Sequence, residues 1–226
     1  MITPAQRHRE FVAAKKAGTA RSAPEPSRQR NAYELMLARL DEDKRRLHLI
    51  QSVERKIAVK REILPVYAAW VDGVLAADSG GQDDVVVTVM IWRIDTGDYA
   101  GALTLAAHAL RHGLVLPDKF KRTLGTLVAE EIADAALRRF AAGDPAFPLD
   151  ILTRVLELTL DADMPDEVRA RLIRAEGLAQ EAAGHPQRAL ASFQHALSLH
   201  DKVGVKKDIE RVQRALKNLA NEQTAK

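Results

Sequence analysis

The chain contains no cysteine, which excludes disulfide bonds and thiolate metal sites and favours an intracellular location. Aromatic residues make up only 4% of it, whereas hydrophobic residues, rich in Ala and Leu, make up 46%. This composition favours an all-α fold over a β-sandwich or β-barrel. No apolar run is long enough to cross a membrane, and the polar start MITPAQRHRE lacks the apolar core of a signal peptide. We therefore expect a soluble protein without a membrane partner.

Sequence signatures of catalysis are also scarce. The chain has no glycine-rich phosphate loop, no nucleophile elbow and no His-Glu-x-x-His motif. His108 and His112 are four residues apart and could share a metal ion on one helix face, but no third ligand is evident nearby. Two partly exposed helix histidines without a metal are the favoured explanation of the pattern. We expect no bound metal at this pair.

The basic residues are unevenly distributed. Residues 1–62 hold 15 Lys or Arg against 8 Asp or Glu, a net charge of +7, although the whole chain carries only +3. Such asymmetry favours an acidic polymer as partner, most often nucleic acid, or else it marks a solvated helix face. The candidate DNA-binding residues are Arg7, Arg9, Lys15, Lys16, Arg21, Arg28, Arg30, Lys44, Arg45, Arg46, Arg55, Lys56, Lys60 and Arg61.

Three regions follow from the distribution of Gly, Pro and apolar residues. Residues 1–30 read as a basic arm, with a short helix over 3–17 and a flexible tether after it. Residues 31–64 contain no Gly or Pro and predict one long helix. Its apolar stripe is compatible with a coiled coil or with packing on the following domain. Pro65 is expected to open a helical body over 65–226.

Within this body, residues 81–113 predict an antiparallel helix pair joined at Thr96-Gly97-Asp98. A similar pattern recurs 87 residues later in the chain. Gly97 then aligns with Gly184, and the two Ala-Leu pairs that follow Gly97 align with the two Ala-Leu pairs that follow Gly184. The repeated pattern resembles the second half of a tetratricopeptide repeat, but generic helix packing gives the same spacing. We expect a second helical hairpin around Gly184.

Clustered carboxylates could hold Mg²⁺ in a nuclease, and the candidates are Asp83, Asp84, Asp95 and Asp98. In the expected hairpin the first two lie at the start of one helix and the last two at its other end, about 16–18 Å away at the helical rise per residue. Helix capping and turn formation explain them without a metal. Mg²⁺ is expected as a cofactor only if the chain is itself an endonuclease.

The last helix carries an apolar stripe at alternating spacings of four and three residues. It fits either a terminal helix that covers the helices before it or a contact with a sister subunit or other partner. The residues of this stripe are Val205, Ile209, Val212, Leu216 and Leu219.

Several segments together resemble a known family. They are PAQRH at 4–8, ILPVYAAWVDGVL at 63–75, GQDDVVVTVMIWRIDTGDYAGAL at 81–103, DMPDEVRARL at 163–172 and GVKKDIER at 204–211. With them the chain resembles the small terminase subunit of temperate, contractile-tailed bacteriophages over nearly its whole length. The central segment is long and specific.

The resemblance implies a protein of the bacterial host cytoplasm that recognises double-stranded viral DNA at its cohesive-end site and delivers it to a large ATPase subunit. It also implies a homo-oligomer and the label of endonuclease. The absence of a phosphate loop agrees with an ATPase in the partner. Small terminases often carry an N-terminal helix-turn-helix, but here Gly18 is followed by a proline-bearing segment and not by a tight turn into a recognition helix. A protein-only adaptor built on the repeat-like helices is the remaining alternative.

Overall fold

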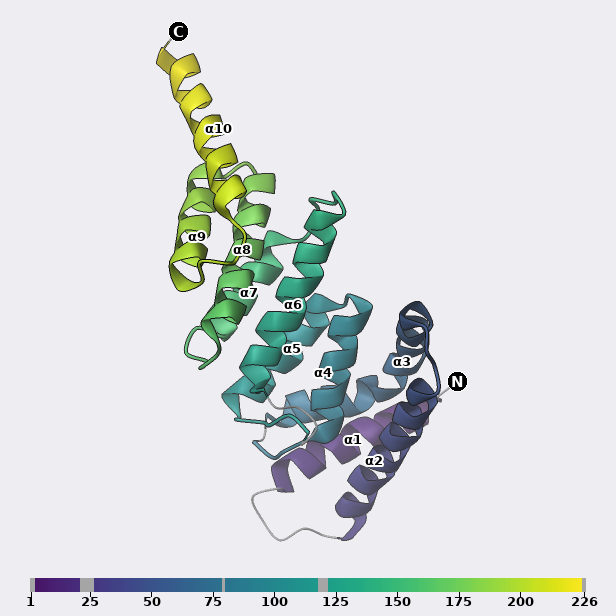
Figure 1. Ribbon diagram of the computed structural model, residues 1–226. Coiled ribbons are helices and arrows are strands. Elements are labelled where there is room, and N and C mark those ends of the chain that lie inside the picture. Colours follow the sequence, from purple (N-terminus) through teal and green to yellow (C-terminus); the bar gives the residue numbers. More distant parts are fainter. Residues whose placement is uncertain (1–2, 21–26, 79, 118–121, 225–226) are drawn as a thin grey trace. The chain divides into compact units, whose positions relative to one another are not determined.

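The computed structural model describes residues 3–20, 27–78, 80–117 and 122–224. Side chains are described for all of these except residues 17–20, 27–31 and 222–224. Every regular element in these ranges is a helix, which confirms the predicted all-α fold (Figure 1). The chain forms two compact units, Met1–Leu124 and Gly125–Lys226. The first contains α1 (Pro4–Ala20), α2 (Ser27–His48), α3 (Val53–Ala77), α4 (Asp84–Thr96) and α5 (Tyr99–Arg111). The second contains α6 (Leu124–Ala141), α7 (Leu149–Leu158), α8 (Asp166–Ala182), α9 (Pro186–Leu199) and α10 (Lys206–Thr224).

The α4–α5 hairpin forms as the sequence predicts (Figure 1). Asp83 caps α4 by accepting the amides of Val85 and Val86, and the chain turns at Gly97, whose φ of 84° favours glycine. Asp98 then caps α5. The run from Val85, although rich in β-branched residues, is helical because both of its faces are buried and no strand is available in the described ranges to pair with it.

A second helical hairpin, α8–α9, lies in the C-terminal unit around the predicted glycine. Gly184 has a φ of 79°, close to that of its counterpart in the first hairpin. Within α8, Gly177 faces Phe193 of α9 so closely that a Cβ would lie 2.6 Å from a ring carbon. The missing side chain therefore allows the two helices to approach. The tetratricopeptide-like character of the hairpins stays a prediction.

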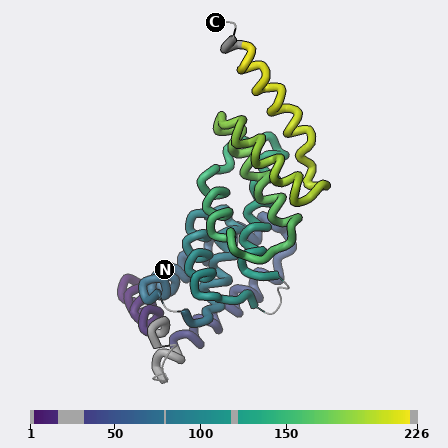
Figure 2. Tube along the Cα trace, turned by 90° about the vertical axis from the view of Figure 1, so that its left-hand side faces the viewer, coloured from purple at the N-terminus to yellow at the C-terminus, as the bar shows by residue number. Residues whose placement is uncertain are grey.

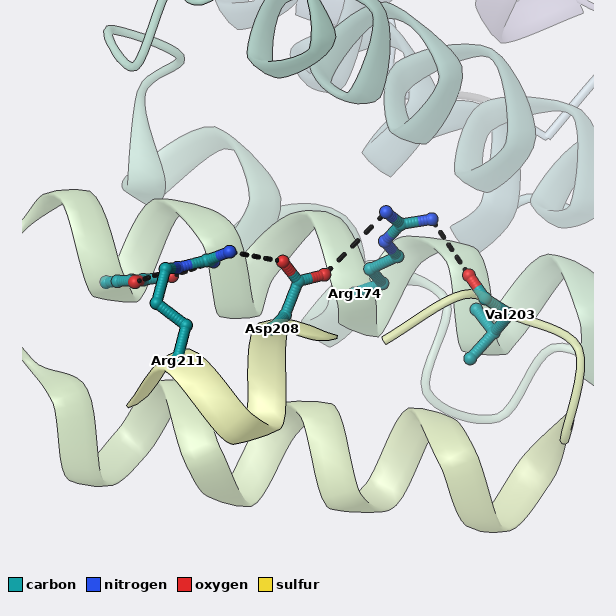
Figure 3. Close-up of polar contacts among 5 residues, drawn as sticks. Arg174, Val203, Asp208 and Arg211 are labelled. Atoms are coloured by element: carbon teal, nitrogen blue, oxygen red, sulfur yellow. Dashed lines mark hydrogen bonds and ion pairs between the residues drawn. The ribbon is translucent and has the colours of Figure 1, made fainter. Parts of the chain in front are cut away.

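A polar network holds α10 against α8 (Figure 3). Arg174 of α8 donates to the Val203 carbonyl at 2.8 Å and lies 3.7 Å from the Asp208 carboxylate. Arg211 of α10 donates to Asp208 at 2.8 Å and, through two nitrogens, to Glu181. Beyond this anchor α10 continues past the ends of α8 and α9 (Figure 2).

The predicted single helix over 31–64 is wrong. The structure places α2 and α3 there, separated by residues 49–52. The break needs no Gly or Pro because Ser52 adopts an extended backbone and caps α3 by accepting the Arg55 amide at 3.3 Å. Pro65, expected to begin the body, lies inside α3 with an exposed ring. Burial of the apolar face around Tyr67 and Trp70 compensates for the backbone hydrogen bond that this proline removes.

The short helix predicted over 3–17 forms as α1, but it is not part of a flexible arm. Helix α1 packs along α3, and Ala14 is fully buried at the contact. At Gly73 of α3 the backbones approach so closely that a Cβ would lie 2.4 Å from the Phe11 carbonyl oxygen. Of the tether predicted over 19–30, residues 21–26 lie outside the described residues, whereas 19–20 belong to α1 and 27–30 belong to α2.

Candidate nucleic-acid interface

The turn between α2 and α3 brings basic side chains from both helices to one surface. An ion pair from Arg46 near the end of α2 to Glu62 of α3, at 3.2 Å, joins the two helices beside the turn. Because α2 ends and α3 begins here, cations that are more than ten residues apart in sequence come close together. They face a single groove.

This basic groove has a volume of about 780 Å³. Lys44 and Arg45 line it from α2, and Lys56 and Lys60 line it from α3. Apolar side chains complete the lining, including Trp92 of α4, which is itself almost fully buried. The other lining residues are Asp41, Leu47, His48 and Leu49. Four cations against a single lining carboxylate make the groove strongly positive.

The four cations differ in how far they are already neutralised. Lys60 is ion-paired with Asp95, and both side chains are partly buried, so this lysine also has a structural role. Lys44 lies 3.9 Å from Asp41, a weak and partly exposed pair. Arg45 is exposed at the rim of the groove, and Lys56 is half-buried in its wall. A polyanion laid along the groove would therefore meet one fully exposed cation, Arg45, and three that are partly buried.

The remaining predicted DNA-binding residues do not line this groove. Arg46 and Arg61 have partners within the unit, the Glu62 carboxylate and the Thr96 carbonyl respectively. Four exposed cations lie on α1, namely Arg7, Arg9, Lys15 and Lys16, and Arg55 is exposed on α3. Arg21 lies outside the described residues, and Arg28 and Arg30 belong to α2 but their side chains are not described.

The four candidate nuclease carboxylates are not brought together. Asp83 is fully buried, and besides capping α4 it accepts the Trp70 indole N–H at 3.1 Å. Asp84 accepts the Gln82 amide N–H at 2.8 Å. At the other end of α4, Asp95 pairs with Lys60, and Asp98 caps α5 and lies 3.5 Å from Arg93. Their positions agree with capping and ion pairing at opposite helix ends.

Among the described residues, one group of three side chains is arranged to hold a metal ion: Asp78, His108 and His112. The sequence indicated the histidine pair but not Asp78, which follows α3 and is 30 residues from His108. Burial lowers the pKa of His108, and the hydrogen bond from His112 lowers the pKa of Asp78.

The apolar stripe of α10 divides into two parts. Val205 and Val212 are buried in the core of their own unit, together with Ala170, Phe193 and other residues. Ile209 and Leu216 are half-buried against this core. Leu219 is 46% exposed. The first part of the stripe therefore covers the α8–α9 hairpin, and Leu219 near the end of α10 is the exposed member.

Residues 37–167 match the profile of a family described as phage small terminase subunit. The match covers more than half of the chain and includes the basic groove. The chain belongs to this family. It is 49% identical over 217 residues to a protein of Escherichia phage P2 named "Terminase, endonuclease subunit". The aligned region covers 96% of this chain and 87% of that protein.

A second relative of this small terminase subunit comes from Haemophilus phage HP1 and is named "Probable terminase, endonuclease subunit". It is 25% identical over 203 residues, which covers 84% of this chain and 72% of the relative. No solved structure matches the chain. Among the described residues, no helix is both long and apolar enough to span a membrane.

Proposed function

We propose that this small terminase subunit binds double-stranded viral DNA through the basic groove between α2 and α3 and delivers it to the large ATPase subunit in the cytoplasm of the bacterial host. The observation that supports DNA binding is the convergence of Lys44, Arg45, Lys56 and Lys60 on one groove. Lysine and arginine contacts to phosphates supply most of the sequence-independent affinity for DNA. Trp92, the aromatic side chain in the lining, is almost fully buried, so it offers no exposed indole ring on which bases could stack.

The groove predicts a measurable salt dependence. If its four cations neutralise four phosphates, log K against log salt concentration has a slope of about −3.6, so affinity falls roughly 150-fold between 50 and 200 mM salt. Cations on α1 that also touch the duplex would make the slope steeper. Fluorescence anisotropy with a labelled duplex that contains the cohesive-end site, at several salt concentrations, measures it.

A triple variant tests the groove itself. Lys44→Gln, Arg45→Gln and Lys56→Gln together remove three charges and leave the Lys60–Asp95 ion pair in place. The expected result is a slope smaller in magnitude by about 2.7. The matched control removes three exposed charges of α10 in the C-terminal unit, with Lys206→Gln, Lys207→Gln and Arg214→Gln.

Unchanged binding by the groove variant, with weakened binding by the α10 control, would contradict the proposal. Point substitutions are preferable to deletion of residues 1–62, because α1 packs on α3 and the deletion would also remove the first turns of α3. Absence of DNA binding by the wild-type chain even at low salt would favour a protein-only adaptor.

The names of both relatives raise a second function, a Mg²⁺-dependent endonuclease in this chain. The same labelled duplex, incubated with and without Mg²⁺ and without the large subunit, tests it directly. Salt-sensitive binding without cleavage would support a recognition subunit that depends on its partner for cutting. Site-specific cleavage that Asp95→Asn or Asp98→Asn abolishes would support a nuclease that uses the carboxylates at the α4–α5 turn.

We also propose that the exposed end of α10 contacts sister subunits or the large subunit. Leu219 continues a stripe whose beginning is buried, and it lies on a helix that extends past its neighbours (Figure 2). Leu219→Lys should reduce the oligomer size or the affinity for the large subunit, as measured by analytical ultracentrifugation. An unchanged sedimentation profile with and without the large subunit would exclude this role for the α10 end.

A further inference from the structure

A carboxylate and two imidazoles converge where α3 ends beside the last turn of α5. Asp78 follows α3 in a left-handed conformation with φ of 45°, and its backbone N–H is bonded to the Val74 and Leu75 carbonyls. Oδ1 of Asp78 lies 2.9 Å from Nε2 of His112 and 3.5 Å from Nδ1 of His108. One potential ligand atom from each of the three residues lies within 4.8 Å of the other two.

His108 is the unusual member of this group. Its side chain is only 1% exposed, yet neither ring nitrogen has a hydrogen-bond partner among the described residues, and Nδ1 is directed at Asp78. A buried polar group without a partner is unfavourable and calls for an explanation such as a bound ion.

We propose that Asp78, His108 and His112 form a binding site for one divalent transition-metal ion, with Zn²⁺ as the ion that the ligands fit best. Two imidazoles and a carboxylate favour Zn²⁺, Co²⁺ or Ni²⁺ over Mg²⁺ and Ca²⁺, which prefer oxygen ligands. Tetrahedral Zn²⁺ with bonds of about 2.0–2.1 Å places its ligand atoms roughly 3.3 Å apart. The two distances from Asp78 bracket this value.

Arg111 is the resident counter-ion of the carboxylate. Its Nη1 lies 3.2 Å from both oxygens of Asp78, but the arginine side chain is 60% exposed and can move into solvent. Metal binding would therefore exchange the Arg111 contact for coordination. Since Asp78 is itself 55% exposed, the remaining coordination position faces water. The bound ion would link the end of α3 to the end of α5 and stabilise the N-terminal unit.

The site can be tested on the full chain after chelator treatment, by titration with Zn²⁺ in a calorimeter and with Co²⁺ in a visible spectrometer. We expect one ion per chain, a visible absorption band for Co²⁺, and a rise in the unfolding temperature with Zn²⁺. Asp78→Asn and His112→Gln, which preserve size, should each weaken Zn²⁺ binding at least tenfold and remove the temperature rise. Mg²⁺ should give none of these signals.

His195→Gln is the matched control. His195 is exposed on α9 and occupies the position of the second hairpin that corresponds to His108. The His195→Gln variant should bind Zn²⁺ with the same affinity as the wild type. A wild-type chain that takes up no Zn²⁺ or Co²⁺, or variants of Asp78 and His112 that bind like the wild type, would overturn the site and leave these residues as a hydrogen-bonded ion-pair cluster.

Discussion

Replacement of Asp83 by alanine should destabilise the N-terminal unit by about 3 kcal/mol. Oδ1 of Asp83 accepts the amides of Val85 and Val86 at 3.0 and 3.1 Å, and Oδ2 accepts the Trp70 indole N–H. Loss of an N-cap costs about 1 kcal/mol. A buried indole N–H left without an acceptor adds about 1–3 kcal/mol. For a unit of this size the sum lowers the unfolding temperature by roughly 10 °C.

Thermal unfolding followed by circular dichroism measures this change, and further variants separate the contribution of the cap from that of the indole hydrogen bond. Asp83→Asn retains an acceptor oxygen and should cost less than alanine. Trp70→Phe removes the indole donor, so Asp83→Ala in that background should cost less than in the wild type. Asp84→Ala is the neighbouring control, because its carboxylate contact is with exposed Gln82, and it should cost no more than about 1 kcal/mol.

An Asp83→Ala variant that unfolds at the wild-type temperature would refute the capping role. A variant that keeps its stability but loses a cleavage activity present in the wild type would instead place Asp83 in a nuclease site.

Three other perturbations follow from the packing. Gly73→Ala should force α1 away from α3, at a cost of about 1–3 kcal/mol, and hydrogen exchange in α1 should become faster; unchanged exchange would contradict the close contact. Asp208→Asn should weaken the bond from Arg211 and lower the unfolding temperature of the C-terminal unit by a few degrees, with the exposed Asp201→Asn as control. Burial and the Asp43 carboxylate raise the pKa of Tyr67, so the folded state retains a proton that the unfolded state loses; stability should fall above pH 10 in the wild type and less in Tyr67→Phe.

The helical hairpins could be predicted from sequence because their signals are local. Asp83 and Asp98 stand at helix starts and Gly97 stands at the turn, so cap chemistry and left-handed backbone fix the ends of α4 and α5 within a few residues. The turn glycine Gly184 likewise allowed the α8–α9 hairpin to be predicted. Such features depend on neighbours in the chain, which any single sequence displays.

The break between α2 and α3 was missed because its signal is weak. Residues 49–51, Leu-Ile-Gln, have ordinary helix propensity, and only Ser52 marks a possible cap. The basic groove follows from this break, so the sequence indicated its cations but placed them along one helix. Asp78 was missed for another reason: its approach to His108 and His112 depends on how α3 packs near α5, which residue spacing does not encode.

The contact at Gly73 has a consequence for comparing relatives. No side chain fits there without displacement of the Phe11 backbone, so the residue at this one position reports on the placement of the N-terminal helix. A relative with glycine at the aligned position can hold that helix against α3 in the same way. A relative with a larger residue must carry the helix farther out, and the surface that its basic residues present would then differ from the one in this chain.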